Sequence, residues 1–300
     1  MNQTLQELAN QIERLKEENL DTTELEASFK KLESQLDEKR SPWDRVLLAR
    51  DPQRPSGLDY INSLLNDFIE FHGDRTYGDD GAIVGGIGML YQMPITVIAV
   101  VKGKNTEENI KRNFGMVHPE GYRKALRLMK QAEKFNRPIL TLIDTPGAYP
   151  GIGAEERGQA TAIAENIMEM MDLKVPTLSI VTGEGGSGGA LALSVTDEIW
   201  MLENAIYSIL SPEGFASILF KDAAKAKDVV DLMKITSHDL LELGIIDEIV
   251  EENEDTMRQL KRNIYETFKK YQKVKPQKLV NDRFKKYRDI GEVHHVSKDR

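Results

Sequence analysis

Gly183-Glu184-Gly185-Gly186-Ser187-Gly188-Gly189-Ala190 is the densest glycine cluster of the chain and the stretch around which its fold can be worked out. It follows the apolar run Pro176–Val181, which predicts a buried strand, and it precedes residues that can open a helix. Backbone N–H groups at the start of a helix bind anions, and glycines let a ligand approach them closely. The stretch therefore predicts a strand-turn-helix junction with an anion site made of backbone.

A second junction of the same kind lies earlier in the chain. The apolar run Pro138–Ile143 is followed by Asp144-Thr145-Pro146-Gly147-Ala148-Tyr149-Pro150-Gly151. In an α/β sheet, loops at the carboxyl ends of parallel strands meet at one edge, and substrates bind there. We therefore expect the two glycine-rich loops to form one site. A single N–H donor in such a site typically stabilises a developing oxyanion by about 3–4 kcal/mol.

Strand-like and helix-like segments alternate on both sides of these junctions. Further strands are predicted at Ala82–Met89, Pro94–Val101 and Glu198–Leu202, and residues 244–250 form a short closing strand or turn. Helices are predicted at Leu58–Phe71, Glu120–Phe135, Ala154–Met171, Asp222–Met233 and His238–Leu243. Strands without polar alternation, separated by helices, indicate an α/β protein with a mostly parallel sheet covered on both faces.

Both ends of the chain are predicted to be helical additions to this body. Near the N-terminus, two short apolar stripes indicate an antiparallel helical hairpin, in which Asp21 or Thr22 can cap the second helix: Leu5, Leu8, Ile12 and Leu15, then Leu25, Phe29, Leu32 and Leu36. From about Asp255, a C-terminal helix places Leu260, Ile264, Phe268 and Tyr271 on one stripe. We divide the chain into a hairpin (1–40), a body (41–254) and a basic helical extension (255–300).

The charge distribution follows the same division. The net charge of −9 combines −4 in residues 1–40, −13 in the body and +8 in residues 255–300. An acidic body argues against a protein that binds nucleic acid or a membrane surface. No run reaches the roughly 20 apolar residues that span a bilayer. Because Met1-Asn2-Gln3-Thr4 also lacks the pattern of a signal peptide, we expect a cytoplasmic protein.

The composition also limits the chemistry. The chain has no cysteine, which excludes a disulfide scaffold, thiol catalysis and a cysteine-ligated zinc site within it. The five histidines are scattered without the spacing of metal ligands, so no metal is expected in this chain. His294-His295 lies in a predicted frayed tail.

Three local motifs suggest other functions. Gly183-x-Gly185-x-x-Gly188 matches the dinucleotide-binding fingerprint, but only about ten residues precede the next strand, too few for a Rossmann helix and turn. Gly185-x-Ser187-x-Gly189 matches the nucleophile elbow of serine hydrolases, which would need His118 or His238 as a base. Asp144-Thr145-Pro146-Gly147 imitates a GTPase switch motif, but the chain has no phosphate-binding loop. The dinucleotide-binding and hydrolase interpretations remain alternatives.

Longer segments resemble one known family. They are Asp51–Pro55, Asn113–Met116, Pro119–Arg127, Ile143–Gly151, Ala154–Gln159, Gly183–Gly189 and Ile209–Gly214. In these segments the chain resembles the acyl-CoA carboxyltransferase branch of the crotonase superfamily, and within it the alpha subunits of bacterial acetyl-CoA carboxylase carboxyltransferase. The resemblance runs from the N-terminal hairpin to at least Val250.

The resemblance implies a fold and a set of partners. The fold would be a crotonase-like spiral of ββα units with two roughly perpendicular sheets, which would explain the short crossover after Gly189. Two such alpha chains would assemble with two beta subunits, which carry a zinc ribbon and most of the coenzyme A contacts. Biotin would be carried by a separate biotin carboxyl carrier protein and loaded by biotin carboxylase, with no cofactor attached to this chain.

The implied activity is transfer of the carboxyl group from carboxybiotin to acetyl-CoA, giving malonyl-CoA, the first committed step of fatty acid biosynthesis. By family correspondence, the N–H groups of Gly188 and Gly189 would bind the biotin ureido oxygen. Gly185 and Gly186 would shape the approach, and the pocket walls would be Gly147, Ala148, Tyr149 and Gly151. No side chain is expected to be an obligatory base, because departing biotin can accept the methyl proton.

Some alternatives stay open at this level. The chain could be a noncatalytic assembly subunit, or a crotonase-like hydratase or acyl-CoA hydrolase that acts alone. The basic stretch Lys102, Lys104, Lys111 and Arg112 could be a solvated loop, or a surface for coenzyme A phosphates or an acidic carrier.

Overall fold

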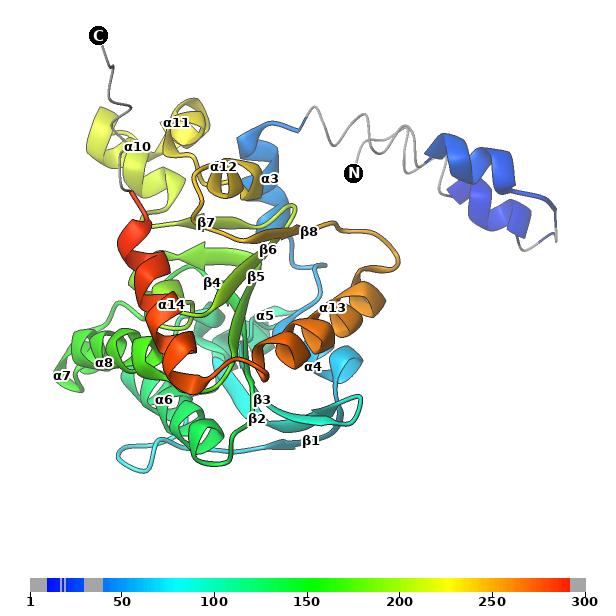
Figure 1. Cartoon of the computed structure of the whole chain (residues 1–300). Coiled ribbons are helices and arrows are strands. Elements are labelled where there is room, and N and C mark those ends of the chain that lie inside the picture. The colour runs from blue at the N-terminus through cyan, green and yellow to red at the C-terminus, as the bar shows by residue number, and fades with distance from the viewer. Residues whose placement is uncertain (1–9, 17, 19, 30–39, 292–300) are drawn as a thin grey trace, which may run out of the picture. The chain divides into compact units, whose positions relative to one another are not determined.

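A computed structural model describes residues 10–16, 18, 20–29 and 40–291 (Figure 1). The chain divides into two compact units, residues 1–44 and 45–300. The three-part division at residues 40 and 254 stays a prediction. Within the described ranges, no helix has both the length and the apolar character needed to cross a membrane.

The N-terminal unit contains helices over residues 10–16 and 23–29. At the start of the second helix, Thr22 is the N-cap residue, whose carbonyl accepts the Glu26 N–H, and Asp21 Oδ1 accepts a hydrogen bond from the Thr23 N–H at 3.0 Å. Lys16 Nζ and Glu26 Oε1 are 2.9 Å apart and link the two helices. The predicted stripe residues Leu5, Leu8, Leu32 and Leu36 lie outside the described residues.

The second unit is built on a sheet of eight strands among its described residues. The strands are β1 (Asn66–Glu70), β2 (Ile83–Leu90), β3 (Met93–Val100), β4 (Ile139–Thr145), β5 (Thr177–Gly186), β6 (Glu198–Leu202), β7 (Ile206–Ser208) and β8 (Glu248–Val250). Their order is β1-β2-β3-β4-β5-β6-β8. Strands β1 to β3 pair antiparallel and strands β3 to β8 pair parallel, so the mostly parallel α/β sheet expected from the sequence is confirmed.

Helices cover both faces of this sheet (Figure 1). The helices among the residues described from Pro42 onward are α3 (Pro42–Ala49), α4 (Gly57–Leu64), α5 (Thr106–Lys111), α6 (Pro119–Lys134), α7 (Ile152–Glu156), α8 (Gln159–Asp172), α9 (Ser187–Leu191), α10 (Pro212–Phe220), α11 (Ala226–Met233), α12 (Ser237–Glu242), α13 (Thr256–Tyr271) and α14 (Pro276–Asp289), with short 3-10 turns at Asn113–Gly115 and Ala223–Lys225. Helices α6 and α8 pack together on one side, and α4 and α13 pack together on the other.

The sheet branches at β5. Residues Leu178–Val181 pair with β6, while the end of the strand, Glu184–Gly186, pairs with β7. The two sheets that the family resemblance implies are therefore joined through β5 into one hydrogen-bonded sheet. The crossover from β5 to β6 contains only the short helix α9, which rules out the full-length helix of a Rossmann unit.

Two predicted helices are wrong in extent. The helix predicted over Leu58–Phe71 ends at Leu64, and Asn66–Glu70 forms the edge strand β1 instead. A Cβ added to Gly86 of β2 would lie 2.0 Å from Ile69 O. The glycines of β2 therefore allow Asn66–Glu70 to approach and pair as a strand. The helix predicted over Ala154–Met171 is broken at Gly158, whose φ of 81° ends α7 before α8 begins.

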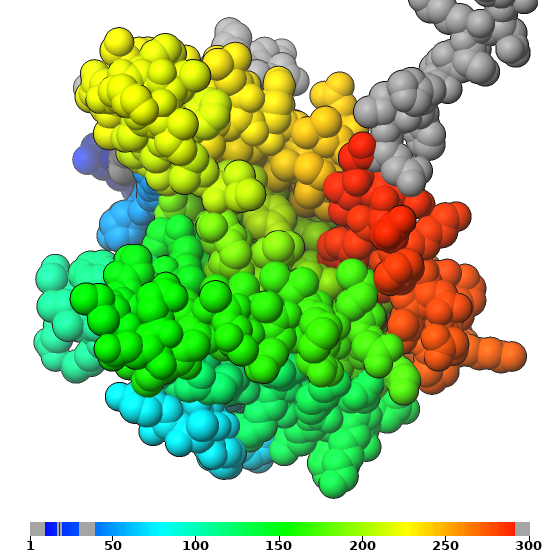
Figure 2. Space-filling model, turned by 90° about the vertical axis from the view of Figure 1, so that its left-hand side faces the viewer, coloured from blue at the N-terminus to red at the C-terminus, as the bar shows by residue number. Residues whose placement is uncertain are grey.

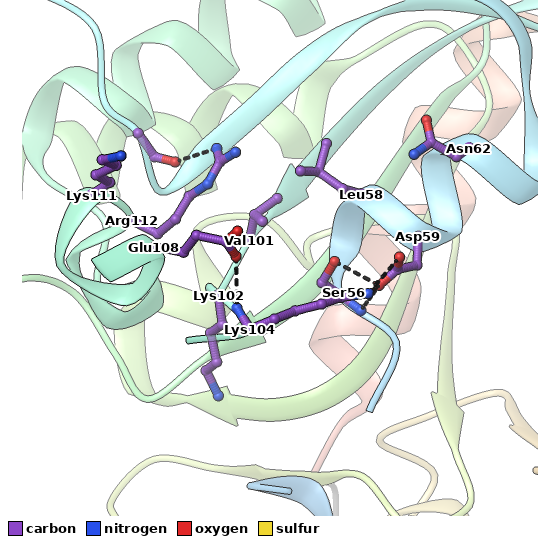
Figure 3. Close-up of a pocket in the computed structure, with 11 residues that line it drawn as sticks. Ser56, Leu58, Asp59, Asn62, Val101, Lys102, Lys104, Glu108, Lys111 and Arg112 are labelled. Carbon is purple, nitrogen blue, oxygen red and sulfur yellow. Dashed lines mark hydrogen bonds and ion pairs between the residues drawn. The ribbon is translucent and has the colours of Figure 1, made fainter. Parts of the chain in front are cut away.

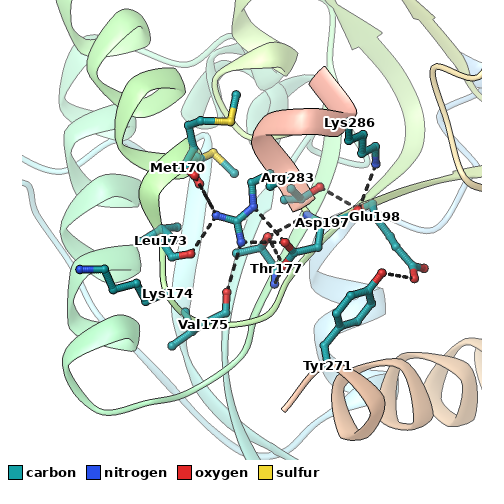
Figure 4. Close-up of polar contacts among 12 residues, drawn as sticks. Met170, Leu173, Lys174, Val175, Thr177, Asp197, Glu198, Tyr271, Arg283 and Lys286 are labelled. Atoms are coloured by element: carbon teal, nitrogen blue, oxygen red, sulfur yellow. Dashed lines mark hydrogen bonds and ion pairs between the residues drawn. The ribbon is translucent and has the colours of Figure 1, made fainter. Parts of the chain in front are cut away.

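The C-terminal extension packs against the core rather than forming one long helix. It breaks after Tyr271, and Pro276 begins α14, a position where its missing N–H costs no hydrogen bond. Arg283 is fully buried, 2.8 Å from Asp197, and also donates to the carbonyls of Met170 and Leu173 (Figure 4). Part of the +8 charge of this segment is therefore neutralised inside the fold.

Candidate functional site

The two glycine-rich loops meet, as the sequence predicts. Thr145 at the end of β4 lies opposite Gly185 near the end of β5. A Cβ added to Gly186 would lie 2.2 Å from Pro146 O, and one added to Gly189 would lie 2.6 Å from Ala148 N. Atoms do not approach that closely, so this contact requires glycine at both positions.

Backbone N–H donors gather where the loops cross. Gly188 and Gly189 lie in the first turn of α9, where N–H groups have no acceptor within the helix. The bridge between Val117 and Ala148 is made by the Tyr149 N–H, 3.0 Å from Val117 O. Among the described residues, the Ala148 N–H has no acceptor of its own. The crossing thus offers neutral donors suited to an anionic oxygen.

Hydrogen bonds from side chains fix the conformation of the loop that follows β4. The Thr145 hydroxyl donates to Gly147 O at 2.8 Å and accepts the Gly147 N–H at 3.0 Å. Gly147 has a φ of 145°, which other residues rarely adopt. Gln159 Nε2 donates to Val117 O and Tyr149 O and so holds the loop to α8. Nothing in the local sequence indicates that Thr145 and Gln159 hold this loop in place.

The remaining predicted residues lie around this crossing at different places. Gly185 faces β7, where its added Cβ would lie 2.8 Å from Tyr207 Cδ2. The Tyr149 ring stacks on His118 with centroids 3.9 Å apart, and Gly151 lies against the Tyr149 ring. Tyr149 and Gly151 therefore lie beside the start of α6. Their role as pocket walls stays a prediction.

Ser187 does not have the surroundings of a catalytic serine. Its φ of 55° is the unusual backbone of a sharp strand-to-helix turn, but among the described residues its hydroxyl has no hydrogen bond. The His118 ring stacks on Tyr149 and contacts Asn113, and His238 is on the exposed side of α12. Neither histidine serves as a base for Ser187, which removes the support for a serine hydrolase.

A network of ion pairs joins the starts of both loops. Glu184 is buried, with Oε1 2.8 Å from Arg50 and Oε2 3.5 Å from Lys102. Lys102 also lies 2.6 Å from Asp144, whose carboxylate accepts the Glu184 N–H. Burial disfavours the charge of Arg50, but its contacts with Glu213 and Glu184 raise its pKa overall. Glu184 is thus a partner of fixed cations. Arg50, on the proline-rich linker before α4, gave no signal in the sequence.

The basic stretch lines a cavity of about 470 Å³ beside the end of β3 (Figure 3). Lys102, Lys104, Lys111 and Arg112 contribute to its wall. Each already has a partner: Lys102 binds Asp144, Lys104 binds Asp59, Lys111 binds Glu107, and Arg112 donates to Gly81 O. Contact with coenzyme A phosphates or an acidic carrier stays a prediction.

Tyr122 is a residue of the site that sequence reasoning missed. It lies on α6, and its hydroxyl is 2.8 Å from the point that a Cβ on Gly189 would occupy. Burial raises the pKa of this hydroxyl. In the described parts of the chain, no group of three or more histidines or carboxylates is placed to hold a metal ion.

Comparison with known proteins agrees with this geometry. A family model described as acetyl co-enzyme A carboxylase carboxyltransferase-like matches residues 1–291. The chain is 56% identical over 259 residues to the acetyl-coenzyme A carboxylase carboxyl transferase subunit alpha of Clostridium botulinum (strain Alaska E43), covering 84% of this chain and 94% of that one. It is also 56% identical over 265 residues to the carboxyl transferase subunits beta/alpha of Clostridium tetani, covering 86% of this chain and 46% of that longer protein.

Among solved structures, transcarboxylase 12S with methylmalonyl-coenzyme A bound has a similar fold. The TM-score is 0.63 at 18% identity, over 74% of this chain, which spans only 42% of that longer chain. This likeness confirms the crotonase-like carboxyltransferase fold expected from the sequence.

Proposed function

Because this chain belongs to the acetyl co-enzyme A carboxylase carboxyltransferase family, we infer that it performs the carboxyltransferase half-reaction of that enzyme as its alpha subunit. The carboxyl group passes from a ring nitrogen of biotin to the methyl carbon of acetyl-CoA, giving malonyl-CoA. The bond from nitrogen to the carboxyl carbon breaks, a carbon–carbon bond forms, and the methyl proton moves to the nitrogen.

The crossing of the two loops is the observation that carries this proposal. Negative charge develops on the ureido oxygen as the carboxyl group leaves, and on the thioester oxygen as the methyl proton leaves. The N–H groups of Gly188, Gly189 and Ala148 suit the ureido oxygen, because neutral donors stabilise an anion without transferring a proton to it. Biotin, when bound, supplies the carboxyl group and a nitrogen able to take the proton.

The ion-pair network around Glu184 fits the same scheme. Both carboxylate oxygens of Glu184 are engaged by cations, because Oε1 accepts a hydrogen bond from Arg50 and Oε2 lies 3.5 Å from Lys102. This side chain is a poor candidate for a group that must take up and release a proton in every turnover. We assign it to holding the glycine loop in place.

The partners follow from the family. The Clostridium tetani relative carries beta and alpha subunits in one chain, which supports a beta subunit as the direct partner of this alpha chain. We propose an assembly of two alpha and two beta subunits, with a zinc ribbon on beta. It would work in the cytoplasm with the biotin carboxyl carrier protein and biotin carboxylase.

An exposed apolar surface is a suitable place for the beta subunit. Figure 2 shows the face on which α10 and α11 lie above α7 and α8. These helices and the turns beside them expose large apolar side chains: Ile152, Met168, Ile209, Ile218, Leu219, Phe220 and Leu232. Exposed apolar surface of this kind marks protein interfaces. Ile218→Lys should weaken co-purification with beta, whereas Ile110→Lys, an exposed isoleucine on α5, should not.

The proposed function is tested by purifying the chain alone and together with the beta subunit. Decarboxylation of malonyl-CoA in the presence of a biotin analogue reports the reverse half-reaction. The complex should be active and the single chain inactive. Thioester turnover by the chain alone would contradict the proposal and favour a hydratase or hydrolase.

A further inference from the structure

Tyr122 carries a polar group that the proposed reaction does not yet use. Its side chain is completely buried, and among the described residues its hydroxyl has no hydrogen-bond partner. A buried hydroxyl without a partner destabilises the folded state. Phenylalanine would fill the same space without that penalty, so packing alone does not account for the oxygen atom.

The Tyr122 hydroxyl lies beside the contact between the two glycine-rich loops. The point where a Cβ on Gly189 would stand is 2.8 Å from the Tyr122 oxygen, 2.6 Å from Ala148 N and 2.8 Å from Gly147 C. The hydroxyl therefore reaches, from α6, the contact between the two glycine-rich loops. Ala148 N, one of the donors assigned to the anion site, lies near the same point.

The residues around Tyr122 fix the helix that carries it. Arg123 Nε lies 2.7 Å from Asp74 Oδ2, and the buried Lys124 donates to Asp79 at 2.7 Å and to Ile83 O at 2.8 Å. These contacts hold the first turns of α6 against the loop before β2. Tyr122, which is completely buried on this helix, is thereby held beside Gly189.

Burial raises the pKa of Tyr122, so the group is a neutral phenol at physiological pH. A neutral phenol next to an anion donates a hydrogen bond. Donors that point at developing charge in a water-poor site are among the strongest contributors to catalysis.

We propose that the Tyr122 hydroxyl is a further hydrogen-bond donor of this site, directed at the anionic oxygen that the N–H groups of Ala148 and Gly189 bind. The proposal rests on the proposed function. The anionic oxygen bound by these N–H groups is the acceptor that the hydroxyl lacks, so the hydroxyl gains a partner when the charge develops.

The test pairs two tyrosines in the complex with the beta subunit. Tyr122→Phe removes an unpaired hydroxyl, whereas Tyr271→Phe removes one that donates to Glu198 at 2.8 Å, at the start of β6 and away from the loops (Figure 4). For Tyr122→Phe we expect an unchanged or higher unfolding temperature, about a tenfold lower kcat and an unchanged KM for malonyl-CoA. For Tyr271→Phe we expect a lower unfolding temperature and an unchanged kcat.

Two results would overturn the proposal. One is a Tyr122→Phe complex with a kcat equal to the wild type. The other is a fall in kcat accompanied by a matching loss of stability, which is the signature of a structural role. An inactive wild-type complex would instead contradict the proposed function itself, and this proposal with it.

Discussion

A Cβ on Gly189 would lie 2.6 Å from the backbone nitrogen of Ala148, so the loop after β5 touches the loop after β4 through a position that admits only glycine. Its neighbour Gly188 is different, because the nearest atom to an added Cβ there is Ile163 Cγ2, at 3.7 Å. A side chain is therefore excluded by steric contact at Gly189 but not at Gly188, and substitution of each glycine tests this difference.

Gly189→Ala should lower kcat of the complex by about a hundredfold or more, because the loops must separate and the donors lose their alignment. Gly188→Ala keeps its N–H and has room for the methyl group, so it should stay within a few-fold of wild type. Decarboxylation kinetics of the two complexes measure this difference. Wild-type activity of the Gly189→Ala complex would favour a chain that only assists assembly.

Glu184→Gln should leave turnover within about tenfold of wild type, because no proton transfer is assigned to this side chain. It should lower the stability of the fold, since Arg50 and Lys102 lose a charged partner that is only 10% exposed. Thermal unfolding and kcat are the measurements. Loss of all turnover with fold and assembly intact would make Glu184 the general base.

Arg283→Ala should destabilise the chain by about 3–5 kcal/mol, because it leaves the carboxylate of Asp197 buried without its cation. The control on the same helix is Lys278→Ala, which breaks an exposed pair with Asp282 and should cost less than about 0.5 kcal/mol. Denaturant unfolding of both variants gives the comparison. Similar values would mean that α14 is not anchored through Arg283.

Acid should destabilise the fold partly through Asp74. Burial alone would raise the pKa of this carboxyl, but hydrogen bonds from the Thr76 N–H and then from Arg123 bring it from 3.8 to about 2. A lowered pKa gives stability that is present above pH 4 and is lost as the pH falls toward 2. That contribution is about 2 kcal/mol, since the side chain is not exposed to solvent.

Asp74→Asn should therefore lower stability at neutral pH and reduce the fall in stability between pH 4 and pH 2. Unfolding free energies across that range measure it, with Asp228→Asn, an exposed aspartate of α11, as the control. An unchanged slope for Asp74→Asn would contradict the assignment.

Much of the site could be predicted from the sequence, because each loop follows an apolar strand and carries its own glycines. Parallel pairing then brings Gly147 and Ala148 to Gly186 and Gly189 without further information. Tyr122 and Arg50 could not be found this way. Tyr122 reaches the loops from α6 and Arg50 from the turn after α3, and nothing in their local sequence marks that contact.

The helix predicted over Leu58–Phe71 shows a second limit. Its apolar spacing suits a helix, but the conformation of Asn66–Glu70 is decided by the glycines of β2, which allow an edge strand to pair there. The spacing of apolar residues within one segment carries no information about a strand elsewhere that can pair with it.

The most direct test of the backbone anion site replaces Ala148 by lactic acid, so that an ester oxygen stands in place of the N–H while the side chain is kept. If this N–H stabilises the reacting anion, kcat of the complex should fall by about 10²–10³ with little change in KM. The same replacement at the exposed Ala224 should leave kcat unchanged. An Ala148 ester with wild-type kcat would contradict the account.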